Sequence, residues 1–123
     1  MAEFRLDYEM LVRHGARPFV FDAGEKVFLE DDTGTGLFII KSGRVDVITY
    51  GTVLENVRAG GIVGEMALID DGSRSAAAIA AEPTEVFSLD KPAFLALIRE
   101  QPEFALHVMR LLTYRLRKMN QHL

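Results

Sequence analysis

The sequence predicts a mixed α+β domain, in which an antiparallel β-barrel or sandwich lies between a short N-terminal helix and C-terminal helices. Three observations predict this class. Apolar residues recur at helical spacing before Gly15, alternate with polar residues through the middle of the chain, and return to helical spacing after Asp90. Glycines divide the alternating part into short segments, as in antiparallel sheets. With 123 residues, the chain is long enough for one domain with one core, and we expect a single domain over 1–123.

The composition excludes several classes of function. A hydrophobic content of 49% with 26% charged residues is ordinary for a globular domain, and the net charge of −4 argues against a general basic surface for nucleic acid or anionic lipid. The chain has no cysteine, which excludes disulfides, thiolate metal sites and cysteine nucleophiles. It also lacks a long apolar run or a signal-peptide pattern. We therefore expect a cytoplasmic protein that binds neither membranes nor nucleic acid directly.

The N-terminal helix is predicted over residues 7–14. Leu6, Met10 and Leu11 recur at helical spacing, and Gly15 follows as a residue that ends helices.

The C-terminal helices are predicted over residues 90–119. Asp90 is a typical N-cap and Pro92 fits the first turn of the helix that follows it. Pro102 predicts the start of a second helix that runs through Arg117.

The strands are predicted within residues 18–89. Alternating apolar pairs mark four of them: Phe19/Phe21, Val27/Leu29, Phe38/Ile40 and Val45/Val47. Between two of these pairs, Ser42-Gly43 predicts a tight hairpin turn, because glycine readily takes a positive φ.

The segment from Gly64 to Ala77 carries the strongest functional pattern. Residues 66–69 are apolar and long enough for one helical turn, whose free N–H groups and positive dipole end would favour an anion near Gly64. Arg74 can donate two parallel hydrogen bonds to a phosphate, and Ser75 can add neutral donors. Glu65 only accepts hydrogen bonds, so it suits sugar hydroxyls, and it could pair with Arg74 in an empty site.

This segment closely resembles the phosphate-binding cassette of cyclic nucleotide-binding domains, the family found in catabolite activator proteins, regulatory subunits of cyclic-AMP-dependent kinase and nucleotide-gated channels. Residues 21–28 and 37–47 resemble two further segments of the family, and the likeness runs from about Asp7 to the last residue. The resemblance implies a jelly-roll-like β-roll. It implies that Glu65 holds the ribose 2′-hydroxyl and that Arg74 holds the cyclic phosphate. The implied cradle is completed by the following residues: Gly64, Met66, Ala67, Ser75 and Ala76.

The resemblance also guides three less direct predictions. Residues 76–81 are rich in alanine and favour a helix by propensity, but the family pattern and the short apolar runs around Pro83 predict a strand. Arg115 and Asn120 fall where catabolite activator proteins carry an arginine near the nucleotide and a hydroxyl residue against adenine. We therefore include both in the expected ligand-binding set.

The last predicted helix has two apolar stripes. Phe104, Val108 and Leu111 form the first stripe. The second stripe follows the spacing of a short coiled coil and consists of Ala105, Met109, Leu112, Leu116, Met119 and Leu123. Both stripes could pack on the barrel, or the second could pair two copies of the chain in a homodimer.

The predicted function is a cyclic nucleotide receptor rather than an enzyme, with cAMP or cGMP as its ligand and no other cofactor or metal. Ser75 matches the serine of bacterial activators that bind cAMP, which favours cAMP. The ligand is expected to move the C-terminal helix as a lid. Because Leu123 follows soon after this helix, the expected output passes through an unknown effector protein, through dimerisation or through a part of a larger transcription regulator or channel.

Other functions fit the sequence less well. A nucleotide-independent interaction scaffold remains the main alternative, but it would not require both Glu65 and Arg74. The three histidines lie outside the predicted strands, which argues against a metal site inside the barrel, and no G-x-S-x-G motif is present. Asp70 and Asp71 are adjacent in a turn and are expected to be solvated rather than catalytic. The basic residues near the end of the last helix are explained by its dipole.

Overall fold

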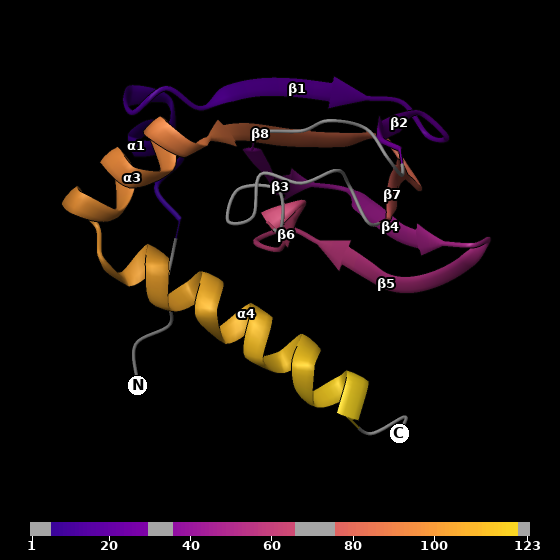
Figure 1. The fold of residues 1–123 in the computed structure, drawn as a ribbon. Coiled ribbons are helices and arrows are strands. Elements are labelled where there is room, and N and C mark those ends of the chain that lie inside the picture. Colours follow the sequence, from indigo (N-terminus) through magenta and orange to yellow (C-terminus); the bar gives the residue numbers. More distant parts are fainter. Residues whose placement is uncertain (1–5, 30–35, 66–75, 121–123) are drawn as a thin grey trace.

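Two four-stranded antiparallel sheets form the body of the protein, with helices at one end and along one side (Figure 1). The computed structural model describes residues 6–29, 36–65 and 76–120. One sheet has the order β1-β8-β3-β6 and the other β2-β7-β4-β5, which confirms the predicted mixed α+β class with an antiparallel β-roll. In chain order the elements are α1 (Tyr8–Arg13), β1 (Arg17–Phe21), β2 (Lys26–Phe28), β3 (Gly36–Ser42), β4 (Arg44–Thr49), β5 (Thr52–Arg58), β6 (Ile62–Val63), β7 (Ala77–Ala80), β8 (Thr84–Asp90), α3 (Lys91–Glu100) and α4 (Glu103–Asn120).

The predicted hairpin at Ser42-Gly43 is wrong. β3 pairs with β8 and β6, whereas β4 pairs with β5 and β7, so the chain crosses from one sheet to the other at Gly43. Gly43 has φ of 91°, and a Cβ there would lie 2.5 Å from the carbonyl oxygen of Pro83. The buried Thr84 hydroxyl accepts a hydrogen bond from the Arg44 amide at 3.2 Å. This corner is therefore held by contacts with residues 83 and 84, which local turn chemistry does not reveal.

The tight hairpin lies instead between β4 and β5. Thr49 pairs with Thr52, and the two residues between them, Tyr50 and Gly51, both have positive φ, at 50° and 76°. This is the geometry of a two-residue turn that matches the twist of the flanking strands.

β3 is buried on both faces, unlike a strand that alternates between core and solvent. Leu37 and Ile39 pack in a cluster with residues of α1, α3 and α4, while Ile40 packs in a second cluster with residues of the other sheet, such as Val45. The sheet that contains β3 therefore lies between the second sheet and the helices, which explains the continuous apolar sequence of this strand.

The alanine-rich segment forms strand β7, as the family pattern predicts. Ala78 and Ala80 are fully buried, and β7 pairs with β2 on one side and β4 on the other. Small side chains fit this crowded centre of the sheet, so backbone pairing on both edges outweighs the helical propensity of alanine.

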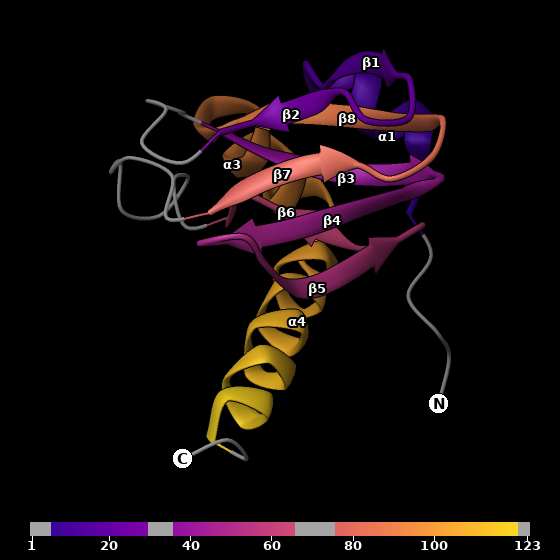
Figure 2. The ribbon, with the colours of Figure 1, turned by 90° about the vertical axis from the view of Figure 1, so that its right-hand side faces the viewer.

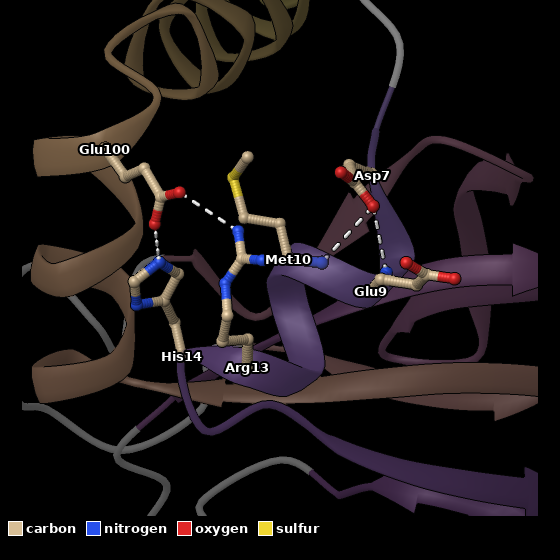
Figure 3. Close-up of polar contacts among 6 residues, drawn as sticks. All are labelled: Asp7, Glu9, Met10, Arg13, His14 and Glu100. Atoms are coloured by element: carbon tan, nitrogen blue, oxygen red, sulfur yellow. Dashed lines mark hydrogen bonds and ion pairs between the residues drawn. The ribbon is translucent and has the colours of Figure 1, made fainter.

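The N-terminal helix begins and ends close to the prediction and is tied to α3 (Figure 3). The Asp7 carboxylate accepts hydrogen bonds from the Glu9 amide at 3.0 Å and the Met10 amide at 3.2 Å, which caps α1. At its other end, Arg13 donates to Glu100 at 2.9 Å and His14 contacts the second oxygen of the same carboxylate. This charged group therefore joins α1 to the last residue of α3.

α3 begins as predicted, with the Asp90 carboxylate accepting a hydrogen bond from the Ala93 amide at 2.9 Å. α4 begins at Glu103, the residue after Pro102, and runs through Arg117 to Asn120, one residue beyond the predicted range of 90–119. Figures 1 and 2 show α4 on the side of the roll where β5 and β6 lie, with its C-terminal end pointing away from the sheets.

The two stripes of α4 differ in burial. Phe104 and Val108 of the first stripe are buried in the core beside β3 and β8. In the second stripe Leu112 packs partly against the same core, but Met109 and Leu116 are 58% and 60% exposed. The hypothesis that both stripes pack fully on the roll is therefore wrong at Met109 and Leu116. The side chain of Met119 and the residue Leu123 lie outside what the structure describes.

Candidate functional site

The candidate site begins where β6 ends. Ile62 and Val63 are buried, and Gly64 follows with φ of 80°, a conformation that favours glycine. This turn brings the next residue, Glu65, to a position where only 8% of its surface is exposed. A carboxylate buried to this extent requires a charged or hydrogen-bonding partner.

Arg115 of α4 supplies that partner and also contacts two other groups. Its Nη1 donates to Glu65 Oε1 at 2.5 Å and its Nη2 donates to the Ile62 carbonyl oxygen at 2.5 Å. Its Nε donates to both carboxylate oxygens of Glu55 on β5, at 2.8 and 3.2 Å. We call Arg115, Glu55, Glu65 and the Ile62 carbonyl the Arg115 cluster. The guanidinium therefore joins α4 to β5, to the first residue of β6 and to Glu65 in the turn after β6.

The charges of the Arg115 cluster do not balance. Two carboxylates face one guanidinium, and the three side chains are only 26%, 10% and 21% exposed for Glu55, Glu65 and Arg115. A planar guanidinium suits this arrangement because its N–H groups point in fixed directions toward separate acceptors, which a lysine ammonium could not reproduce. Arg115 contacts one oxygen of Glu65. Among the residues that the structure describes, none is recorded on the second oxygen, which can accept a hydroxyl donor.

The structure brings two of the predicted site residues together. Glu65 and Arg115 form a direct ion pair although 50 positions separate them in the sequence. Gly64 lies beside Glu65, and Ala76 is half-buried just before β7. Asn120 is exposed at the end of α4, beyond Arg115. The remaining predicted ligand-binding residues, Met66, Ala67, Arg74 and Ser75, lie outside the described residues, as do the expected helical turn over 66–69 and the expected pairing of Glu65 with Arg74.

Glu55 is a member of the cluster that sequence reasoning missed. A signal was present, because Glu55 lies two residues before the buried Val57 and so faces the same side of β5. An acidic residue on the inward face of a strand needs a cation close by. The sequence does not indicate which of the 14 basic residues is that cation.

Other chemistries find little support in the described residues. Over 6–29, 36–65 and 76–120, no group of three or more His, Asp or Glu side chains is placed to hold a metal ion. Within the same ranges, no helix has the length and hydropathy required to cross a membrane.

Comparison with known proteins decides the family. A family model described as the cyclic nucleotide-binding domain matches residues 18–101, which include β6, Gly64 and Glu65. The chain belongs to the cyclic nucleotide-binding domain family. The resemblance drawn from the cassette sequence is thereby confirmed.

Individual relatives agree with this family. The cyclic AMP receptor protein of Thermus thermophilus is 35% identical over 109 residues, which cover 85% of this chain and 50% of that protein. A cAMP-dependent protein kinase regulatory subunit of Yarrowia lipolytica is 32% identical over 77 residues, 63% of this chain and 20% of that protein. The crystal structure of the Thermus thermophilus catabolite activator protein superimposes with a TM-score of 0.79 at 32% identity, covering 94% of this chain and 56% of that one. The chain thus spans about half or less of the length of these relatives.

Proposed function

We propose that this cyclic nucleotide-binding domain is a receptor for cAMP. In this role Glu65 accepts a hydrogen bond from the ribose 2′-hydroxyl, and Arg74 binds the cyclic phosphate. The backbone around Gly64, Met66 and Ala67, with Ser75 and Ala76, completes the phosphate cradle. The domain binds the nucleotide and transmits a signal, and it catalyses no reaction. We place it in the cytoplasm.

The observation that carries this proposal is the buried carboxylate of Glu65 directly after Gly64. Glu65 is 8% exposed and is held by a guanidinium at 2.5 Å, so its orientation is fixed in a largely dry environment. An oriented carboxylate can accept a ribose hydroxyl and cannot bind the phosphate of the same ligand. The phosphate then requires a separate cation, which the sequence supplies as Arg74.

The proposed signal passes through α4. Arg115 connects this helix directly to Glu65, so a ligand that contacts Glu65 changes the interactions available to the helix. A shift in the position of α4 requires that the ligand interact differently with its two positions, and the contact between Arg115 and Glu65 provides such a difference. Asn120, further along α4, is proposed to approach the base. The output passes to another protein, to a second copy or to a further segment of a longer chain.

The preference for cAMP over cGMP rests on the relatives. The receptor protein and the kinase regulatory subunit that match this chain are both named for cAMP, and Ser75 agrees with cAMP-binding bacterial activators. cGMP remains the second ligand to be measured.

Isothermal titration calorimetry of the purified protein with cAMP tests the proposal. Wild type should bind, and Arg74→Ala should lose about tenfold or more in affinity, because a charge-assisted hydrogen bond to phosphate contributes about 1.5–3 kcal/mol. Arg99→Ala, on the exposed side of α3, is the matched control and should bind like wild type. Binding of Arg74→Ala within about threefold of wild type would exclude the phosphate role. Absence of binding by wild type to both cAMP and cGMP would favour the interaction scaffold.

We also propose that the exposed stripe of α4 pairs two copies of this chain. Met109 and Leu116 lie on the coiled-coil spacing and are more than half exposed, and Leu54 on β5 is 63% exposed. Few heptads are available in α4, so the association should be weak and sensitive to single substitutions.

Leu116→Glu should dissociate this dimer without unfolding the protein. In a symmetric dimer the substitution places two like charges at the same contact, whereas in the monomer the new side chain is exposed to water. Sedimentation velocity measures the association and a thermal melt checks the fold. A wild type that stays monomeric, or a variant that sediments like a dimeric wild type, would contradict the proposal. A large loss of melting temperature would show instead that Leu116 packs in the monomer.

A further inference from the structure

Glu55 makes more contacts with Arg115 than Glu65 does. Its two carboxylate oxygens lie 2.8 and 3.2 Å from Arg115 Nε, whereas Glu65 accepts from Nη1 through one oxygen. Glu55 belongs to β5, which is paired along its length with β4, so its backbone is held within a sheet. By contrast, Arg115 reaches the cluster at the end of a long side chain from a separate helix.

The position of the Arg115 guanidinium therefore depends on Glu55. Arginine has several rotatable bonds, and ordering them has an entropic cost that a single contact recovers only in part. When Glu55 fixes Nε, the planar geometry of the guanidinium directs Nη1 toward Glu65 and Nη2 toward the Ile62 carbonyl. The orientation of the Glu65 carboxylate is then determined by a residue that does not touch it.

We propose that Glu55 is a positioning residue for ribose recognition, acting through Arg115 on Glu65. This inference rests on the proposed function, because it assumes that Glu65 accepts the ribose 2′-hydroxyl. Glu55 itself contacts no ligand in this account. Glu55 contributes by keeping the Glu65 carboxylate oriented before the hydroxyl arrives. Binding then has a smaller entropic cost, because the Glu65 side chain is already ordered.

Removal of the negative charge of Glu55 has a second, opposite effect that an experiment must separate. The Arg115 cluster carries one more negative charge than positive charges, and this excess repels an anionic ligand. Neutralising Glu55 therefore raises the affinity for any cyclic nucleotide through general electrostatics. This effect is the same for cAMP and for 2′-deoxy-cAMP, because both carry the same phosphate charge. The ratio of the two affinities isolates the contribution of the 2′-hydroxyl.

The test measures the affinities of cAMP and 2′-deoxy-cAMP for wild type and Glu55→Gln by calorimetry. Wild type should prefer cAMP by about tenfold or more, as expected for a hydrogen bond to a charged acceptor. Glu55→Gln keeps the shape of the side chain but replaces one acceptor oxygen with an N–H donor that faces Arg115 Nε. The preference should fall by about threefold or more. Glu85→Gln is the matched control, because Glu85 is exposed and pairs with Lys41 at 3.6 Å, and it should keep the wild-type preference.

A Glu55→Gln protein with the wild-type preference would overturn the positioning role while leaving the proposed function intact. A wild type that binds neither ligand would instead overturn the proposed function and this inference together. If Glu55→Gln melts well below wild type, Glu55→Asp provides the same comparison, since it keeps the negative charge and shortens the reach to Arg115. Its preference should also fall below that of wild type, and an unchanged preference would count against the inference.

Discussion

Within the described residues, two charged groups join helices to distant parts of the chain, and they differ in burial and in the number of side chains they connect. The Arg115 cluster ties α4 to β5 and to the turn after β6, with side chains that are 10–26% exposed. Arg13, His14 and Glu100, which we call the Glu100 group, tie α1 to α3 (Figure 3). In this second group Arg13 and Glu100 are 60% and 44% exposed.

This difference in burial distinguishes the Glu100 group, a structural contact at the surface, from the Arg115 cluster, which can transmit the effect of ligand binding. Exposed ion pairs contribute little, since water already solvates both partners and salt screens them. Partly buried pairs have lost much of that solvation, so the loss of one partner leaves an unsatisfied charge. Of the two groups, the Arg115 cluster alone contains residues of the candidate site, Glu65 and Arg115. We infer that changes to the Arg115 cluster alter both stability and ligand affinity, whereas changes to the Glu100 group alter stability alone.

Arg115→Ala should give the largest change in stability. It leaves Glu55 and Glu65 close together without their shared cation, at a cost of about 1–3 kcal/mol, below the range for a fully buried pair because Arg115 is 21% exposed. Chemical denaturation of the two variants compares this with Arg13→Ala, which should lose much less stability because its pair with Glu100 is exposed to solvent. Equal losses in the two variants would remove the basis for distinguishing the clusters by burial.

Glu100→Gln should give a smaller and pH-dependent change. The contact with His14 lowers the pKa of Glu100 from its ordinary value of 4.5, burial opposes this shift, and Arg13 supports it. A carboxylate whose pKa is lowered by folding stabilises the protein above its unfolded pKa and loses that contribution as the pH falls through the folded pKa. Wild type should therefore melt above Glu100→Gln near pH 7, and the difference should shrink as the pH falls below 4.5.

The matched control for this pH series is Glu85→Gln, which removes an exposed carboxylate from a longer pair with Lys41. Its difference from wild type should change less across the same pH range. A difference between wild type and Glu100→Gln that stays constant between pH 7 and the acid region would contradict the stabilising role of the ionised Glu100.

Local signals predicted the elements whose ends are set by their own side chains. Asp90 caps α3 as expected, because an N-cap hydrogen bond joins residues that are close in the sequence, and the helix predicted from residue 7 is α1, which Asp7 caps. Strand β7 was predicted only with the help of the family pattern, since its alanines favour a helix until β2 and β4 pair with both edges. The turn at Gly43 was predicted wrongly, because the choice between a hairpin and a crossing depends on contacts with Pro83 and Thr84, forty residues later.

The residues of the candidate site also divide into those predicted from the sequence and those that only the fold reveals. Glu65 and Gly64 were predicted from a short motif, and Arg115 from its position in the family pattern. Glu55 was missed because its role arises only when α4 packs beside β5, a contact between residues 60 positions apart. Spacing along the sequence reveals groups that lie on one turn or one strand, whereas a charge that is satisfied across elements is revealed only by the fold.

The most direct test of the account measures cAMP and 2′-deoxy-cAMP binding to wild type and Glu65→Gln. Glutamine keeps the size of the side chain and loses the charge that makes the carboxylate a strong acceptor. Glu65→Gln should lose affinity for cAMP by about tenfold or more, while its affinity for 2′-deoxy-cAMP should change much less. Equal losses for the two ligands would show that Glu65 does not contact the ribose hydroxyl and would contradict the central claim.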